Sequence, residues 1–237
     1  MPLFSKTLST NIIAFTSDRS VDFSFDNDQF VLNEAQRGFL CSQLNSDLPE
    51  PMRIRQVHGD KIIVAEKSLS VKHDCPEADG LITNVMGLSL AILTADCLPV
   101  FLYDDQKDGV GLIHAGWKGG QKNIVGQAIK LMEQHWQSDP QNIRVAFGPA
   151  IRPCCYEVGS EFQEIFPENL IMRDHRYYLD LPQRIQGQLL SAGIKKANIF
   201  DCNICTCCNA NYFSFRREGE KAGRMISIIM IKTKAGD

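Results

Sequence analysis

The chain has 237 residues, of which 44% are hydrophobic and 22% charged, so it is long enough to bury a substantial core. Its formal net charge of -3 gives no reason to expect a nucleic acid or an anionic membrane as a general partner. The N-terminal residues lack a secretory signal, and no apolar run reaches the roughly eighteen residues of a membrane span. We therefore expect one cytoplasmic domain over residues 1–237.

The cysteines indicate free thiols or metal ligands rather than disulfide bonds. The nine cysteines are an odd number, and they include the adjacent pair Cys154 and Cys155 and the crowded segment CNICTCC at residues 202–208. Small secreted domains that depend on disulfides have an even number of spaced cysteines. The cysteine pattern is therefore not that of a secreted disulfide framework.

The N-terminal part of the chain is predicted to contain an edge strand at residues 12–15 and a helix at residues 33–44. The next segment, RIRQVHGDKIIVAE, alternates apolar and polar residues on the two sides of a glycine-containing turn. This pattern predicts a hairpin with strands at residues 53–57 and 62–65. His58 is then expected at the tip of the hairpin.

Four apolar runs follow, separated by Gly, Pro and Asp, and we expect them to form one central sheet: ADGLIT, LSLAILTA, PVFLYD and GVGLIHA. Helical spacing of apolar residues predicts helices over residues 120–136 and 182–191, the second ending at Gly193. Further strands are expected at NIRVAFGPAI, ANIFD and MISIIMIK. Hairpin-like pairs outnumber crossover units, which predicts an α+β fold with two packed mixed sheets and helices outside.

His58, Cys97 and His114 each stand at or just after the end of a predicted strand. Two imidazoles and a thiolate suit a divalent transition metal, and three protein ligands leave a fourth position open, as in catalytic zinc sites. Zinc there would lower the pKa of a bound water toward neutrality. The same residues also fit a metal-free site with Cys97 as a nucleophile activated by a histidine, and Asp96 is placed to orient either site. Singly, each residue also fits a structural role.

The segment HAGWKGG adds a candidate anion site, because a helix that begins near Gly120 would present free N–H groups beside the cation of Lys118. Trp117 would stack on a planar base or pack in the core. The alternative for the whole segment is a glycine-rich turn with an exposed lysine. Spacing leaves both interpretations open.

The C-terminal segment offers further candidate ligands. Two CxxC spacings, Cys202 to Cys205 and Cys205 to Cys208, would suggest a structural zinc if a second spaced pair existed. Because Cys154 and Cys155 are adjacent, we do not expect a closed four-thiolate site. Guanidinium groups suit oxyanions, and the candidates for phosphate contacts are Arg216, Arg217 and Arg224.

The chain resembles the YfiH-type laccase-domain family in motifs that follow one another in the family's order: QVHGD, EADGLIT, TADCLPVFLYD, GLIHAGWKGG, GPAIRPCCYEVG and CTCCNANYFSFRREGEKAGR. The resemblance implies a four-layer α/β/β/α sandwich of mixed sheets. It also implies that His58, Cys97 and His114 are active-site zinc ligands. The activity implied is that of a purine nucleoside phosphorylase that also deaminates adenosine.

Under this resemblance the partners are purine nucleosides and phosphate, and the protein is a monomer or a homodimer. The expected substrate or phosphate contacts are Asp96, Trp117, Lys118, Arg216 and Arg217. The older family label is polyphenol oxidase or multicopper laccase, but five histidines are few for several copper ions. The alternatives are a metal-free cysteine hydrolase or amidase, including one that edits cell-wall precursors, and a non-catalytic interaction protein.

Two features depart from the family pattern. Residues 17–28, SDRSVDFSFDND, stand where a glycine-rich segment is expected, which leaves substrate preference open and makes Arg19 the candidate for the family's arginine in that region. Arg152 stands where a small residue is more usual. We expect it to change the charge at the entrance of the site.

Overall fold

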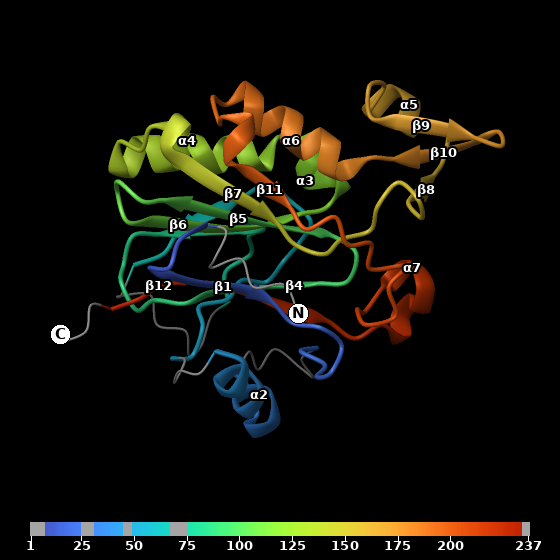
Figure 1. Cartoon of the computed structure of the whole chain (residues 1–237). Coiled ribbons are helices and arrows are strands. Elements are labelled where there is room, and N and C mark those ends of the chain that lie inside the picture. Colours follow the sequence, from blue (N-terminus) through green and yellow to red (C-terminus); the bar gives the residue numbers. More distant parts are fainter. Residues whose placement is uncertain (1–7, 25–30, 45–48, 67–74, 234–237) are drawn as a thin grey trace.

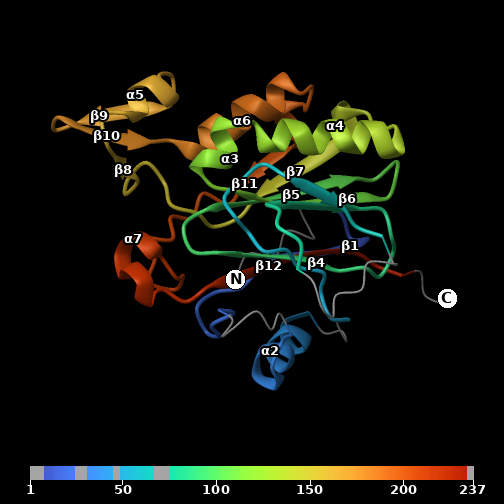
Figure 2. The ribbon, with the colours of Figure 1, turned by 180° about the vertical axis from the view of Figure 1, so that it is seen from behind.

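The computed structural model describes residues 8–24, 31–44, 49–66 and 75–233. Two β-sheets lie face to face, and helices cover the outer face of each (Figure 1). Helix α2 (Glu34–Leu44) covers the smaller sheet, and α3 (Trp117–Gln121), α4 (Ile124–Trp136) and α6 (Leu181–Ser191) cover the larger sheet, as the view from behind also shows (Figure 2). The predicted α+β fold with four α/β/β/α layers is confirmed.

The larger sheet has six strands and mixed pairing. Their order is β11 (Ile199–Asp201), β7 (Ile143–Phe147), β5 (Leu98–Asp104), β6 (Gly109–Ala115), β3 (Gly80–Thr83) and β2 (Ile62–Val64). The outer pairs β11–β7 and β2–β3 are parallel, and the other pairs are antiparallel. Every residue of β5 and β6 is buried, because one face packs on helices and the other on the smaller sheet. This explains their almost continuous apolar sequences.

The smaller sheet joins the two ends of the chain to its middle. It has the order β1 (Ile12–Thr16), β12 (Met225–Ile231) and β4 (Leu90–Thr94), and both pairs are antiparallel. The prediction that the run at β4 belongs to one sheet with β3, β5 and β6 is wrong. After β4 the chain turns at Asp96, whose backbone is in the left-handed region (φ 87°), and enters the other sheet as β5.

The predicted hairpin around His58 is also wrong, because residues 53–57 form no strand and do not pair with β2. Met52 forms an isolated parallel bridge with Leu90 of β4, whereas β2 pairs in parallel with β3. The Gln56 side chain takes the place of further ladder bonds, since its amide donates to the Leu93 carbonyl (2.8 Å) and accepts from the Leu93 N–H (2.7 Å). His58 and Cys97 therefore both lie where the chain passes between the sheets.

The predicted helices are largely confirmed. Asn33 caps α2, and Gly193 follows α6 with a positive φ of 93°. The helix predicted over residues 120–136 is two helices, separated at Asn123 by a left-handed residue (φ 59°). None of the described helices is long and apolar enough to cross a membrane. One domain over residues 1–237 stays a prediction.

A smaller unit lies at one end of the sandwich (Figure 1). It contains α5 (Phe162–Ile165) and a three-stranded antiparallel sheet in the order β8 (Glu157–Val158), β10 (Arg176–Leu179) and β9 (Leu170–Arg173). The short helix α7 (Phe215–Glu218) lies at the same end. Helix α7, Tyr156 just before β8, and the two segments where the chain passes between the sheets contribute residues to one cavity.

Candidate active site

A cavity of about 580 Å³ is lined by all three predicted metal ligands, His58, Cys97 and His114. Its size lies in the range typical of small-molecule sites. Polar, charged and aromatic side chains share the wall. Those used below are Arg55, Gln56, Asp96, Trp117, Tyr156, Phe215, Arg216 and Arg224.

His58, Cys97 and His114 converge from three separate segments. One ligand atom of each lies within 4.8 Å of those of the other two, and the imidazole centroids are 4.8 Å apart with the rings nearly perpendicular (79°). His114 is buried at the end of β6, whereas His58 is exposed. Three nitrogen and sulfur donors that face a cavity on one side fit a tetrahedral ion with one open position.

Asp79 holds two of these ligands in place. Its fully buried carboxylate accepts from His114 Nδ1 (2.8 Å) and from the backbone N–H of His58 (2.9 Å) and Gly59 (2.6 Å). Burial raises the pKa of Asp79, but His114 and the backbone N–H groups of Gly59 and Val57 outweigh it and hold the pKa below the usual value. A carboxylate bonded to Nδ1 leaves Nε2 of His114 for a metal. The quoted motif EADG contained this residue, but we did not predict its role.

Two glycines make room for the ligands. A Cβ on Gly116 would lie 3.2 Å from Cys97 Sγ and 3.4 Å from the His58 ring, and a Cβ on Gly119 would lie 3.1 Å from the Gly59 carbonyl oxygen. Helix α3 therefore approaches the His58 turn more closely than larger residues would allow. This close approach is the structural reason for Gly116 and Gly119 in HAGWKGG.

The electrostatics of the three ligands favour a charged thiolate. Burial raises the pKa of Cys97, but the histidines outweigh it and lower the pKa to about 6. Burial lowers the pKa of His114, while Cys97 and Asp79 raise it to about 9. Without a metal, the pair is thus a thiolate beside an imidazolium. With a metal, the same thiolate is the form that binds.

Asp96 organises the cavity wall through its neighbours. Its carboxylate accepts from Thr206 Oγ1 (2.6 Å), Ser214 Oγ (3.1 Å) and the backbone N–H of Arg216 (2.6 Å). These bonds attach the start of α7 to the residue next to Cys97. Asp96 is therefore an anchor in the cavity wall, and both of its carboxylate oxygens already accept hydrogen bonds from the protein.

Arg216 and Arg224 line the cavity, as does Arg55, which the sequence did not single out. Arg216 Nη1 donates to the carbonyl oxygens of Cys155 (3.2 Å) and Glu157 (2.8 Å), and its guanidinium lies 5.4 Å from the centroid of the Tyr156 ring. Among the described residues no acceptor contacts its Nε or Nη2. Arg216 therefore retains N–H groups for an anion.

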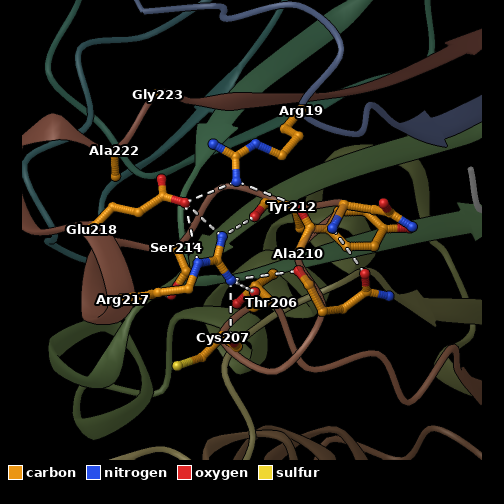
Figure 3. A network of polar contacts seen from close by, with 12 residues as sticks. Arg19, Thr206, Cys207, Ala210, Tyr212, Ser214, Arg217, Glu218, Ala222 and Gly223 are labelled. Atoms are coloured by element: carbon orange, nitrogen blue, oxygen red, sulfur yellow. Dashed lines mark hydrogen bonds and ion pairs between the residues drawn. The ribbon is translucent and has the colours of Figure 1, made fainter.

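Arg217 lies outside the cavity lining and holds a loop together (Figure 3). Its guanidinium donates to the carbonyl oxygens of Thr206 (2.8 Å), Cys207 (3.0 Å) and Tyr212 (2.5 Å) and to Glu218 (2.7 Å). Arg19 also donates to Glu218 (3.0 Å) and is not in the cavity lining. Residues 25–28 of the atypical N-terminal segment lie outside the described residues.

Of the remaining candidates, Trp117 lines the cavity, whereas Lys118 and Arg152 do not. Trp117 lines the cavity and packs against Phe162, with ring centroids 5.1 Å apart, whereas Lys118 lies outside the lining with its Nζ 5.6 Å from the Trp117 ring. The helix start predicted near Gly120 is wrong, since α3 begins at Trp117 and the Gly120 N–H donates to Gly116. Arg152 is buried, pairs with Asp201 through two 2.6 Å bonds, and does not line the entrance.

Comparison with known proteins finds relatives that cover most of the chain. The chain is 38% identical over 187 residues, 76% of each protein, to a purine nucleoside phosphorylase of Clostridium acetobutylicum. It is 31% identical over 209 residues, 81% of this chain and 79% of the relative, to adenosine deaminase RL5 of an unknown prokaryotic organism.

Its fold matches the crystal structure of the hypothetical protein YfiH of Bacillus licheniformis with a TM-score of 0.83 and 27% identity, over 94% of both chains. Residues 19–232 match the family described as multi-copper polyphenol oxidoreductase laccase. The matched residues include His58, Cys97 and His114 and the two segments where the chain passes from one sheet to the other. The chain therefore belongs to this family, the YfiH-type laccase-domain proteins, as its motifs predicted.

Proposed function

We propose that the protein is a zinc-dependent purine nucleoside phosphorylase that also deaminates adenosine. The observation that carries the proposal is the cavity, in which His58, Cys97 and His114 meet beside the guanidinium of Arg216. The names of the relatives in Clostridium acetobutylicum and the RL5 protein support the same two activities. The substrates would be purine nucleosides, with phosphate for the first activity and water for the second.

The donor set fits zinc. Two neutral imidazoles and a thiolate are ligands that zinc prefers, and the Asp79 contact to His114 Nδ1 is the supporting interaction expected behind a metal-bound histidine. Zinc bound here would supply a Lewis acid and lower the pKa of a water molecule that it holds. Copper is the alternative in the family's description, but the chain's five histidines are few for a multicopper centre.

The protein's own groups would bind and orient the substrates. In phosphorolysis a phosphate oxygen attacks the anomeric carbon, the bond to the purine nitrogen breaks, and the base leaves with the electron pair. Arg216 would hold the phosphate through its remaining N–H groups. The aromatic rings of Trp117, Tyr156 and Phe215 in the cavity wall provide surfaces against which a purine can stack.

Product analysis tests the proposal directly. Purified protein is incubated with adenosine, inosine or methylthioadenosine, with and without phosphate, and the products are separated by chromatography. Phosphate-dependent release of free base and phosphate-independent conversion of adenosine to inosine are expected, and both activities should be lost in Cys97→Ser. A zinc-loaded protein that forms neither base nor inosine would disprove the proposal.

A metal-free cysteine hydrolase is the second candidate, and the lowered pKa of Cys97 beside His114 favours it. The two candidates differ in their response to a chelator. Activity that survives complete zinc removal but disappears in Cys97→Ser would select the hydrolase, with amides such as cell-wall precursors as substrates. Activity that is lost on chelation and restored by zinc selects the phosphorylase.

A further inference from the structure

Four thiols outside the candidate active site form a second cluster. Cys154, Cys155, Cys205 and Cys208 have sulfur atoms that all lie within 4.8 Å of one another. Cys208 Sγ is 3.5 Å from Cys154 Sγ and 3.2 Å from Cys155 Sγ. The expectation that an adjacent cysteine pair excludes a four-thiolate grouping was therefore wrong.

Backbone hydrogen bonds bring the four thiols together without help from the sulfurs. The N–H groups of Cys155 and Tyr156 both donate to the Arg152 carbonyl (2.9 Å each), which forms a turn that presents both adjacent cysteines. A second turn is closed by the Asn209 N–H and the Cys205 carbonyl (3.0 Å).

The two turns are joined through Ala150. Its carbonyl accepts from the Thr206 N–H (3.1 Å), its N–H donates to the Ile204 carbonyl (3.2 Å), and it forms an isolated parallel bridge with Cys205. The thiol arrangement is thus fixed by the fold itself. A ligand that needs all four thiols would find them already assembled.

The spacing suits a single metal ion. Zinc–sulfur bonds of about 2.3 Å in a tetrahedron separate the sulfurs by about 3.8 Å, close to the 3.5 Å and 3.2 Å observed. An iron–sulfur cluster needs wider spacing because several iron atoms lie between its thiolates.

We infer that Cys154, Cys155, Cys205 and Cys208 bind a second zinc ion in a closed, structural four-thiolate site. The four protein ligands leave no open position for a substrate, unlike the three ligands in the cavity. The ion joins the turn that precedes Tyr156 to the turn that contains Thr206. Both turns reach the active site, because Arg216 donates to the Cys155 carbonyl and Thr206 donates to Asp96.

Metal content per chain tests the inference. Protein purified under reducing conditions is examined by native mass spectrometry, and two zinc ions per chain are expected for the wild type. Cys97→Ser should retain one ion, in the thiol cluster, and Cys208→Ser should retain one, in the cavity. Cys41→Ser is the matched control and should retain both, because this thiol lies on α2 outside both clusters. Cys207 is unsuitable as a control, since it is adjacent to Cys208 in the sequence.

Cobalt substitution provides a readout that does not depend on activity. Charge-transfer absorption from thiolate to Co²⁺ increases with the number of bound thiolates, here four in the cluster against one in the cavity. Cys208→Ser should therefore lose most of this absorption, and Cys97→Ser should keep most of it.

Two results would overturn the inference. One is a Cys97→Ser protein without zinc, a test that leaves the four thiols intact and remains valid even if Cys208→Ser does not fold. The other is a wild-type mass that is lower by two hydrogens because the cluster has formed a disulfide.

Discussion

The two metal-binding candidates of this protein differ in what surrounds the ligands. His58, Cys97 and His114 face a cavity and are supported from behind by the buried carboxylate of Asp79. The four thiols lie on two surface turns, with Cys154 and Cys208 exposed. Three supported ligands beside a cavity suit catalysis, whereas four ligands that close the coordination sphere suit structure. The number of ligands and their surroundings therefore decide what an ion can do.

The largest expected effect comes from removing Cys97. Cys97→Ser should lower kcat/KM for nucleoside phosphorolysis by at least roughly 10³-fold, because the variant lacks the thiolate that would bind the zinc ion in the cavity. The melting temperature should change less than in Cys208→Ser. Steady-state kinetics and thermal melts of both variants measure this contrast. Equal losses of activity in the two variants would contradict the distinction between a catalytic cluster in the cavity and a structural cluster of four thiols.

Asp79→Asn should have the next largest effect, and only on the cavity site. The change removes a carboxylate that holds His114 and the His58 turn, and loss of such a supporting group typically reduces metal affinity or activity by about 10–100-fold. Competition with a chromophoric chelator measures the affinity of each zinc. Asp60→Asn is the control, because Asp60 is also near the turn but pairs with Lys122 and Gln127. Weaker zinc binding at the four thiols would contradict the prediction.

Arg216 and Arg217 are adjacent in sequence but differ in position, and this difference gives a third prediction. Arg216→Ala should raise KM for phosphate about tenfold, the scale of one charge-assisted hydrogen bond. Arg217→Ala should leave that KM unchanged and lower the melting temperature, because its guanidinium binds the carbonyls of Thr206, Cys207 and Tyr212. If KM for phosphate is the same in both variants and in the wild type, Arg216 does not bind phosphate.

The sequence predicted the elements more reliably than their pairing. The apolar runs at β3, β4, β5 and β6 all predict strands, but an apolar run does not reveal which sheet a strand joins. The change of sheet depends on one left-handed residue, Asp96, and on the Gln56 side chain that bonds to Leu93. Neither feature has a distinctive local pattern. The hairpin at His58 was consequently predicted where the chain crosses between sheets.

The residues that converge at the cavity were easier to predict than the groups that hold them in place. His58, Cys97 and His114 were found from their residue types and the family motifs, and they meet as expected. Asp79 was missed because its role depends on contacts with a turn some twenty residues earlier and a strand after it. The four thiols were missed because sequence spacing does not show that a turn at Arg152 presents two adjacent cysteines to the same side.

The smallest expected effect is that of Cys208→Ser on catalysis. The thiol cluster reaches the cavity only through other residues, chiefly the bond from Arg216 Nη1 to the Cys155 carbonyl. Arg216 also donates to the Glu157 carbonyl, and its backbone N–H donates to Asp96, so two of its three hydrogen bonds remain when the turns loosen. KM for phosphate should therefore rise by no more than about threefold, under 1 kcal/mol, while kcat is unchanged and the melting temperature falls. A loss of kcat as large as that of Cys97→Ser would mean that the four thiols take part in the reaction.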